Sequence, residues 1–511
     1  MSRSQALISW LEDTSDWLSP LVVKEVRQVV RGREFNYSFG GALAAGLAVA
    51  FFGAADALTG SGTSGRWTFY ALMGCMAFLG LGVVPLGAFS ALRNERMEQT
   101  LELITLTALS PRRVVIGKLL AQGVKIATLF AAMAPFLAMS FLLGGIDFVT
   151  ILLSLAVVFM WSLWSCAVCL FASTLLKSRA MSGVVFGAVA VVLFVLFSLS
   201  RAMFFMFPRG GPVVGFGVSG GGGTTADMWW TLAIATTFCL ATMVNLVLLA
   251  ENRLSLPTEN RVTPLRVGFL VQFLLIVGWT LTFIKEPPRV QDNALNLLGV
   301  AGGIHLAIVA MFTLTEDLVV PRRVLRRMKS PRGLAWLMSM FWPGGGRGAG
   351  YVLRQMAVLL AIAWLFHPAP TTLRWFWAMC GYICFFTGIP TLALRMAKPA
   401  AEASLKLRVI ILLLVPISML LPDVIHYVVW RPEILDLSYS ARHLINPLRT
   451  LANWSLVEMR QWTLVPFVLG MTGVVSYGAL IVMGANVEAG AADRQRSAAA
   501  AGEPGSADAT Y

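Results

Sequence analysis

Apolar stretches long enough to cross a membrane recur along most of this chain, and they constrain its fold more than any other feature of the sequence. A membrane-spanning helix needs roughly 20 apolar residues, and about twelve such stretches fit along the chain. Of the 511 residues, 57% are hydrophobic and only 13% are charged. The core of a soluble protein could not bury so large a share of apolar residues. We therefore predict an all-α, polytopic membrane protein.

The predicted spans form two halves with the same layout, in which a long connection follows the second span of each half. The first half supplies spans at residues 38–58, 67–92, 119–144, 148–175, 181–207 and 228–250. The second half supplies spans at residues 267–284, 294–314, 351–366, 373–394, 409–429 and 462–483. This layout predicts two six-helix halves that are related in topology, although no similarity between their individual residues is evident.

The remaining segments flank these halves. We expect residues 1–36 to form a cytoplasmic N-terminus, residues 37–250 the first six-helix unit and residues 251–485 a second, divergent unit. Residues 486–511 are rich in Ala, Gly and Ser, a composition typical of a disordered tail.

Lys and Arg residues gather in every second loop, which sets the orientation of the spans. Cytoplasmic loops retain positive charge, and basic clusters precede the first predicted span and follow the second, fourth, sixth, eighth and tenth. Both termini are therefore expected in the cytoplasm. The same clusters account for the net charge of +14. Because no basic domain exists outside the spans, we expect no nucleic-acid partner.

A segment ahead of the first span predicts an amphipathic helix. Residues 19–35 read SPLVVKEVRQVVRGREF, in which Pro20 suits a first helical position. Lys24, Arg27 and Arg31 share one face, and valines supply the apolar area. Such a helix would lie at the cytoplasmic interface, with its basic side among the headgroups of membrane lipids. The alternative is a plain orientation signal.

The connection after the second span carries the strongest functional signal. Residues 95–118 read ERMEQTLELITLTALSPRRVVIGK, with acidic residues first, then a Ser-Pro break and basic residues. Glu95, Glu98 and Glu102 recur near helical spacing and would project into water, while apolar residues between them face lipid or neighbouring helices. We interpret this segment as a docking surface for a partner at the membrane face.

Motifs for chemistry within the chain itself are missing from the sequence. Its glycine-rich runs lack the Gly-Lys-Ser/Thr of a nucleotide-binding loop, and its four histidines lack metal-ligand spacing. All six cysteines fall in predicted spans, including the C-x-x-C pair Cys166 and Cys169, which we interpret as packing residues. We expect no catalytic residue, metal or cofactor in this chain.

Two alternatives to a partner-driven protein stay open. A stand-alone secondary carrier would place carboxylates at mid-depth in the bilayer, where no acid convincingly lies. An intramembrane lipid-modifying enzyme would need His305, Arg201 and Asp423 to converge in one cavity, whereas these residues are dispersed over several spans.

The two cytoplasmic segments resemble those of ABC-2 type transporter permease subunits. In that family an interfacial helix rich in Lys, Arg and Gln precedes span one, as PLVVKEVRQVVRGREF does here. Between spans two and three the family carries E-x-x-x-x-T-L-E-L-L, a Ser-Pro turn and a Gly-Lys that enters span three. The residues that match are Glu95, Thr100, Leu101, Glu102, Leu103, Leu109, Ser110, Pro111, Gly117 and Lys118.

This resemblance implies that residues 95–111 form a coupling helix, on which a separate cytoplasmic ABC ATPase docks and transmits nucleotide-driven closure. It also implies a permease subunit of an exporter in a bacterial inner membrane, with ATP used by the partner. The likeness covers roughly residues 1–250, and the second connection lacks the acidic Thr-Leu-Glu run. The second half either completes a single-chain pseudo-dimer or accompanies a chain that forms a homodimer.

Overall fold

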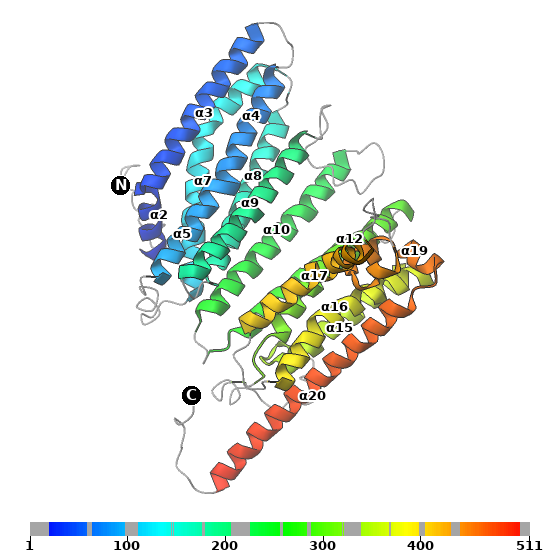
Figure 1. Cartoon of the computed structure of the whole chain (residues 1–511). Coiled ribbons are helices and arrows are strands. Elements are labelled where there is room, and N and C mark those ends of the chain that lie inside the picture. The colour runs from blue at the N-terminus through cyan, green and yellow to red at the C-terminus, as the bar shows by residue number, and fades with distance from the viewer. Residues whose placement is uncertain are drawn as a thin grey trace. The chain divides into compact units, whose positions relative to one another are not determined.

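The protein is built from helices (Figure 1). The computed structural model describes residues 20–58, 64–97, 111–144, 146, 148–175, 179–205, 225–255, 259–283, 288–318, 320, 339–366, 369–397, 404–430 and 440–500. Within these ranges every assigned element is helical, as lipid requires of a spanning chain that must satisfy its own backbone hydrogen bonds. The predicted class, a polytopic α-helical protein, is confirmed at this level.

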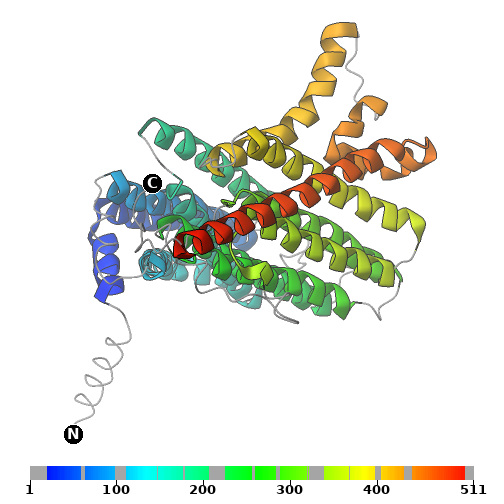
Figure 2. The ribbon, with the colours of Figure 1, turned by 90° about the horizontal axis from the view of Figure 1, so that it is seen from below.

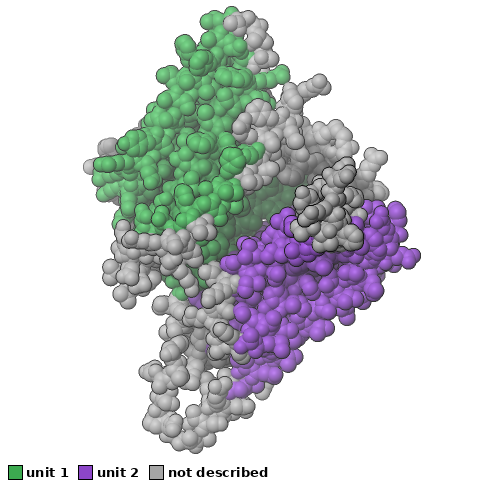
Figure 3. Space-filling model, in the orientation of Figure 1, with its two compact units in different colours: residues 1–255 green, residues 256–511 purple. Residues whose placement is uncertain are grey.

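The chain divides into two compact units, residues 1–255 and residues 256–511, which Figure 3 shows in different colours. The elements of unit 1 are α2 (Pro20–Arg31), α3 (Arg33–Leu58), α4 (Ser64–Phe78), η1 (Leu79–Val83), α5 (Val84–Met97), α7 (Pro111–Leu142), α8 (Phe148–Ser173), α9 (Arg179–Phe205) and α10 (Thr225–Leu254). Those of unit 2 are α11 (Val262–Thr282), α12 (Pro288–Leu314), η2 (Ser339–Phe341), α15 (Gly345–Phe366), α16 (Pro370–Ala397), α17 (Ser404–Trp430), η3 (Ala441–Ile445), α18 (Pro447–Ala452), α19 (Trp454–Met459) and α20 (Leu464–Ala500).

Each predicted span overlaps a helix. Among the described residues, ten helices are long and apolar enough to cross a membrane. The described parts of α9 and α17 contain shorter apolar runs, Val185–Phe194 and Leu407–Ser418. Twelve crossings, with both termini on the cytoplasmic side, therefore stay a prediction.

Two boundaries differ from those expected. The sequence predicts one helix over residues 19–35, whereas the chain breaks at Gly32, between α2 and α3. Glycine is a weak helix former, which favours a break there. At the other end of the chain, α20 continues to Ala500, so residues 486–500 are helical rather than part of a disordered tail. Alanine, abundant in this stretch, is the strongest helix former.

The two units share part of their pattern of helix neighbours. In unit 1, α8 packs against α5, α7 and α10, and α7 packs against α4 and α10. In unit 2, α16 packs against α12, α15 and α20, and α15 packs against α12 and α20. Matched in chain order, α7, α8 and α10 correspond to α15, α16 and α20. Each unit is therefore a helix bundle with a related internal arrangement.

A π-helical turn, η1, joins α4 to α5 within the second span of unit 1. The N–H of Val84 donates to the carbonyl of Leu79, five residues earlier, and Pro85 follows with no N–H to donate. Such turns occur mostly as single insertions in α-helices, frequently at functional sites. Leu79 and Val83 of this turn line the groove of unit 1 described below.

A close contact in unit 2 joins α16 to α20, which runs alongside α16 and α15 in Figure 2. A methyl group on Gly381 would lie 2.7 Å from the Cα of Gly470, and one on Gly473 would lie 2.5 Å from the backbone nitrogen of Phe385. Small residues let apolar helices approach closely in a membrane, where packing replaces the hydrophobic effect as the driving force.

We expect Gly473→Ala to destabilise unit 2, because the added methyl group would overlap the backbone of α16. Overpacking of this kind costs about 1–3 kcal/mol. The measurement is the thermal unfolding midpoint of the purified chain in detergent. Gly478→Ala is the matched control on α20, since its Cβ position has no contact with a neighbouring helix within 4 Å. Equal effects of the two substitutions would contradict this packing argument.

Candidate functional site

A buried ion cluster lies at the base of the predicted docking segment, and we call Glu25, Glu95 and Lys118 the Lys118 cluster. The Nζ of Lys118 donates to both carboxylate oxygens of Glu25, at 3.2 and 3.1 Å, and to Oε1 of Glu95 at 2.6 Å. The side chain of Lys118 is 3% exposed and that of Glu25 is 9% exposed. One ammonium group therefore joins three elements, α2, α5 and α7.

The helices place each member of this cluster. Glu25 is the only acid of α2, and it is buried where α2 packs against α7. Glu95 lies in the last turn of α5, and Lys118 lies two turns into α7. Residues 98–110, between these two helices, lie outside the described residues. The Lys118 cluster thus fixes both flanks of the docking segment, and the interfacial helix, to one point.

The structure brings together only some of the residues that the sequence singled out. Pro111 begins α7 and Gly117 is buried in it beside Lys118. The predicted docking residues that lie outside the described residues are Glu98, Thr100, Leu101, Glu102, Leu103, Leu109 and Ser110. Sequence reasoning missed Glu25, although a lone acid in a helix of valines and basic residues was a usable signal.

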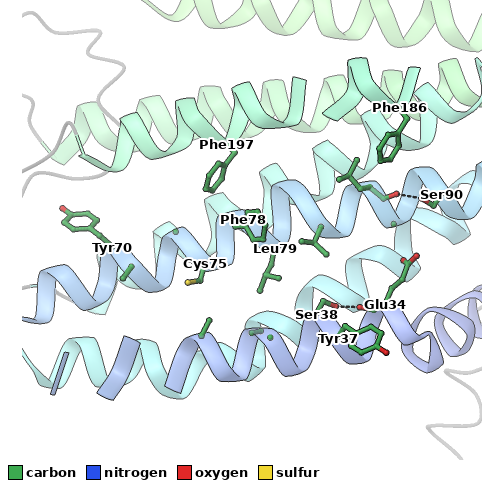
Figure 4. A pocket seen from close by; sticks show the side chains of 18 of the residues that line it. Glu34, Tyr37, Ser38, Tyr70, Cys75, Phe78, Leu79, Ser90, Phe186 and Phe197 are labelled. Atoms are coloured by element: carbon green, nitrogen blue, oxygen red, sulfur yellow. Dashed lines mark hydrogen bonds between the residues drawn. The ribbon is translucent and has the colours of Figure 1, made fainter. Parts of the chain in front are cut away.

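An open groove of about 1080 Å³ lies within unit 1, lined by α3, α4, η1, α5 and α9 (Figure 4). Aromatic side chains of α9 reach towards the second span. The rings of Phe197 and Phe78 lie 6.0 Å apart, and those of Phe186 and Phe89 lie 5.7 Å apart. Much of the lining is therefore apolar, and its residues come from three of the predicted spans.

Polar groups gather at one end of this groove. The hydroxyl of Ser38 donates to the carbonyl of Glu34 at 2.7 Å, and Ser90 lies on the same side of the groove in Figure 4. A methyl group on Gly87 would lie 3.2 Å from Oε2 of Glu34 and 3.6 Å from Nζ of Lys125. Gly87 therefore leaves room for two charged groups where a larger side chain would crowd them. The groove thus has charged groups at one end and a largely apolar body.

Unit 2 has its own buried ion pair, formed by Arg266 of α11 and Glu316, which follows α12. The Arg266 guanidinium also donates to the carbonyls of Met340 at 2.6 Å, Trp342 at 2.7 Å and Gly344 at 3.0 Å. The Gly344 N–H donates to Oε2 of Glu316 at 3.2 Å. These contacts join the two described flanks of the second long connection. Residues 321–338 within that connection lie outside the described residues.

The pKa of Glu316 reflects opposing influences. Burial raises the pKa of this carboxyl, while the charge and hydrogen bonds of Arg266 and the N–H of Gly344 act to lower it. The positive partner is therefore what offsets the cost of keeping Glu316 ionised in a buried position.

Residues that an intramembrane enzyme would need have other described contacts. The Oδ1 of Asp423 lies 2.8 Å from Nε2 of His443, and its Oδ2 accepts from Arg449 at 3.1 Å. His305 is buried, with its ring 5.8 Å from that of Phe273. Within the described ranges, no group of three or more His, Cys, Asp or Glu side chains is placed to hold a metal ion.

Comparison of the sequence with protein-family models gave no match, and searches of curated proteins and of solved structures gave none either.

We expect Lys118→Met to destabilise unit 1, because it leaves the buried carboxylate of Glu25 and the partly buried one of Glu95 without their shared cation. Removing one partner of a buried ion pair costs about 3–5 kcal/mol. Thermal unfolding of the purified chain measures the loss. Arg113→Met is the matched control, since this arginine is exposed near the start of the same helix. A midpoint for Lys118→Met equal to that of the control would contradict the role given to the cluster.

We expect Arg266→Met to destabilise unit 2 more at neutral than at acidic pH. Without Arg266, the pKa of Glu316 in the folded chain rises further above its unfolded value, so the folded state holds this proton more tightly. Stability is then retained below the unfolded pKa and lost as the pH rises through the folded pKa. Thermal midpoints between pH 5 and pH 8 test this. The double variant Arg266→Met/Glu316→Gln should lose the added pH dependence, and its persistence would contradict this assignment.

Proposed function

We propose that this chain is the membrane-spanning permease subunit of an ATP-driven exporter of the ABC-2 type. A separate cytoplasmic ATPase would dock on residues 95–111 and supply the energy for transport. The proposal rests on the sequence of this segment and on the Lys118 cluster at its flanks. The chain itself would bind no nucleotide.

The Lys118 cluster supports the proposal because it provides a mechanical connection. A partner that moved residues 98–110 would pull on the end of α5 and the start of α7, which Glu95 and Lys118 hold together. Both helices continue into predicted spans. The bond from Lys118 to Glu25 would pass the same displacement to the interfacial helix α2. A movement at the surface would thus reach three elements of unit 1.

The groove of unit 1 supports a transport role by its position and chemistry. It lies against the second span, whose far end carries Glu95, so a shift of α5 would change the width of the groove. Its largely apolar body and the charged groups at one end suit an amphipathic substrate. A lipid, a lipophilic drug or an apolar peptide would each meet this description.

Affinity capture with in-membrane crosslinking tests the proposal. We expect crosslinkers placed in residues 98–110 to trap a stoichiometric soluble protein that carries a nucleotide-binding loop. The charge reversal Glu98→Lys/Glu102→Lys should reduce partner-stimulated ATP hydrolysis at least tenfold, because two acidic contacts become repulsive, at about 1.4 kcal/mol for each tenfold change. Membrane insertion should stay unchanged.

Glu259→Lys is the control, since Glu259 is exposed and belongs to unit 2 rather than to the segment under test. Unchanged ATP hydrolysis in the double variant, together with no crosslinked ATPase, would overturn the proposal. In that case, transport that depends on an ion gradient would identify a stand-alone carrier.

A further inference from the structure

The exposed face of α2 has a charge pattern that the Lys118 cluster does not use. Lys24, Arg27, Gln28 and Arg31 are three or four residues apart, so they share one face of the helix, and all four are exposed. The only acid of the helix, Glu25, is turned inward to Lys118. The outward face of α2 therefore carries three cations and no acid.

The cations on this face are available to bind an anion. Within the described part of the chain, no hydrogen bond or ion pair engages the side chains of Lys24, Arg27 or Arg31. Together with Gln28 and Val23, they line a shallow surface hollow of about 410 Å³. Three cations and an amide donor around one hollow match the oxygens of a phosphate group.

An apolar edge lies directly beside the basic face. Val23, one turn before Arg27, lines the hollow and is 39% exposed. Val22, Val26 and Val30 continue this edge and are only half-buried. The single residue Gly32 separates α2 from α3, so the helix is held close to the end of a predicted span. A phosphate site with an exposed apolar border beside the end of a predicted span fits a phospholipid, whose headgroup and acyl chains would meet the two surfaces.

We propose that the hollow on α2 is a binding site for an anionic phospholipid. The phosphate and any further negative group of the lipid bind Lys24, Arg27 and Arg31, while its acyl chains lie along Val23 and its neighbours. The bond between Glu25 and Lys118 sets the rotation of α2, so that these cations face the lipid. This site does not depend on the transport function proposed above.

An acidic protein partner fits this surface less well. A protein that bound the cations would leave the exposed valine edge to be covered separately. The edge and the basic face are adjacent on one short helix, and a lipid covers both at once. The experiment below therefore distinguishes binding of a lipid from binding of a protein.

Native mass spectrometry of the full chain in detergent tests the site, with phosphatidylglycerol and phosphatidylcholine as the two titrants. We expect the chain to bind phosphatidylglycerol in preference. Lys24→Gln/Arg27→Gln should weaken that binding about 30-fold, which corresponds to about 1 kcal/mol for each cation at an anionic membrane surface. The charge-preserving variant Lys24→Arg/Arg27→Lys should bind nearly as well as the original chain, which separates lost charge from lost folding.

The matched control is Arg112→Gln/Arg113→Gln, which removes the same charge from exposed positions at the start of α7. This variant should keep its phosphatidylglycerol. Equal loss from both double variants would overturn the proposal, as would equal binding of the two lipids. Displacement of the lipid by an excess of inorganic phosphate would reassign the hollow to small anions. Loss of a captured protein from Lys24→Gln/Arg27→Gln, with lipid binding intact, would reassign it to a protein partner.

Discussion

Burying a lysine ammonium almost completely is costly unless carboxylates face it, and unit 1 meets that requirement with two. Lys118 binds Glu25 of α2 and Glu95 of α5, so a helix outside the bundle and the end of the second span are both fixed to the third span. Arg266 and Glu316 provide a corresponding bond in unit 2. In both units, charge pairing lies at the flanks of the connection that follows the second predicted span, where the apolar packing of the spans ends.

The sequence was sufficient to predict the helices, because apolar stretches of membrane-spanning length have few other folds open to them. It also indicated both flanks of the docking segment, since Glu95 and Lys118 belong to one local pattern. It could not indicate that they bind each other or that Glu25 joins them. Helical spacing identifies neighbours three or four residues apart on one helix, whereas Glu25 and Lys118 are 93 residues apart in the chain.

The groove and the close contacts between helices could not be predicted from the sequence either. They depend on which residues far apart in the chain lie side by side. Gly87 and Gly473 look like any other glycine of a membrane helix, and only the packed structure shows that charged groups surround one and a helix backbone presses on the other. The basic face of α2 was visible in the sequence, because amphipathic periodicity is local. Its exposure was not, since that depends on which side of the helix α7 covers.

The π-helical turn between α4 and α5 has a geometric consequence for the Lys118 cluster. One residue inserted into an α-helix turns every later side chain by about 100° around the axis and moves it about 1.5 Å along. The two ends of the second span are therefore out of phase with each other. With this offset, the carboxylate of Glu95 points to Lys118. In an uninterrupted α-helix of the same sequence, the Glu95 carboxylate would point about a quarter turn away. The irregularity next to the groove thus sets the direction of an ionic contact at the far end of the span.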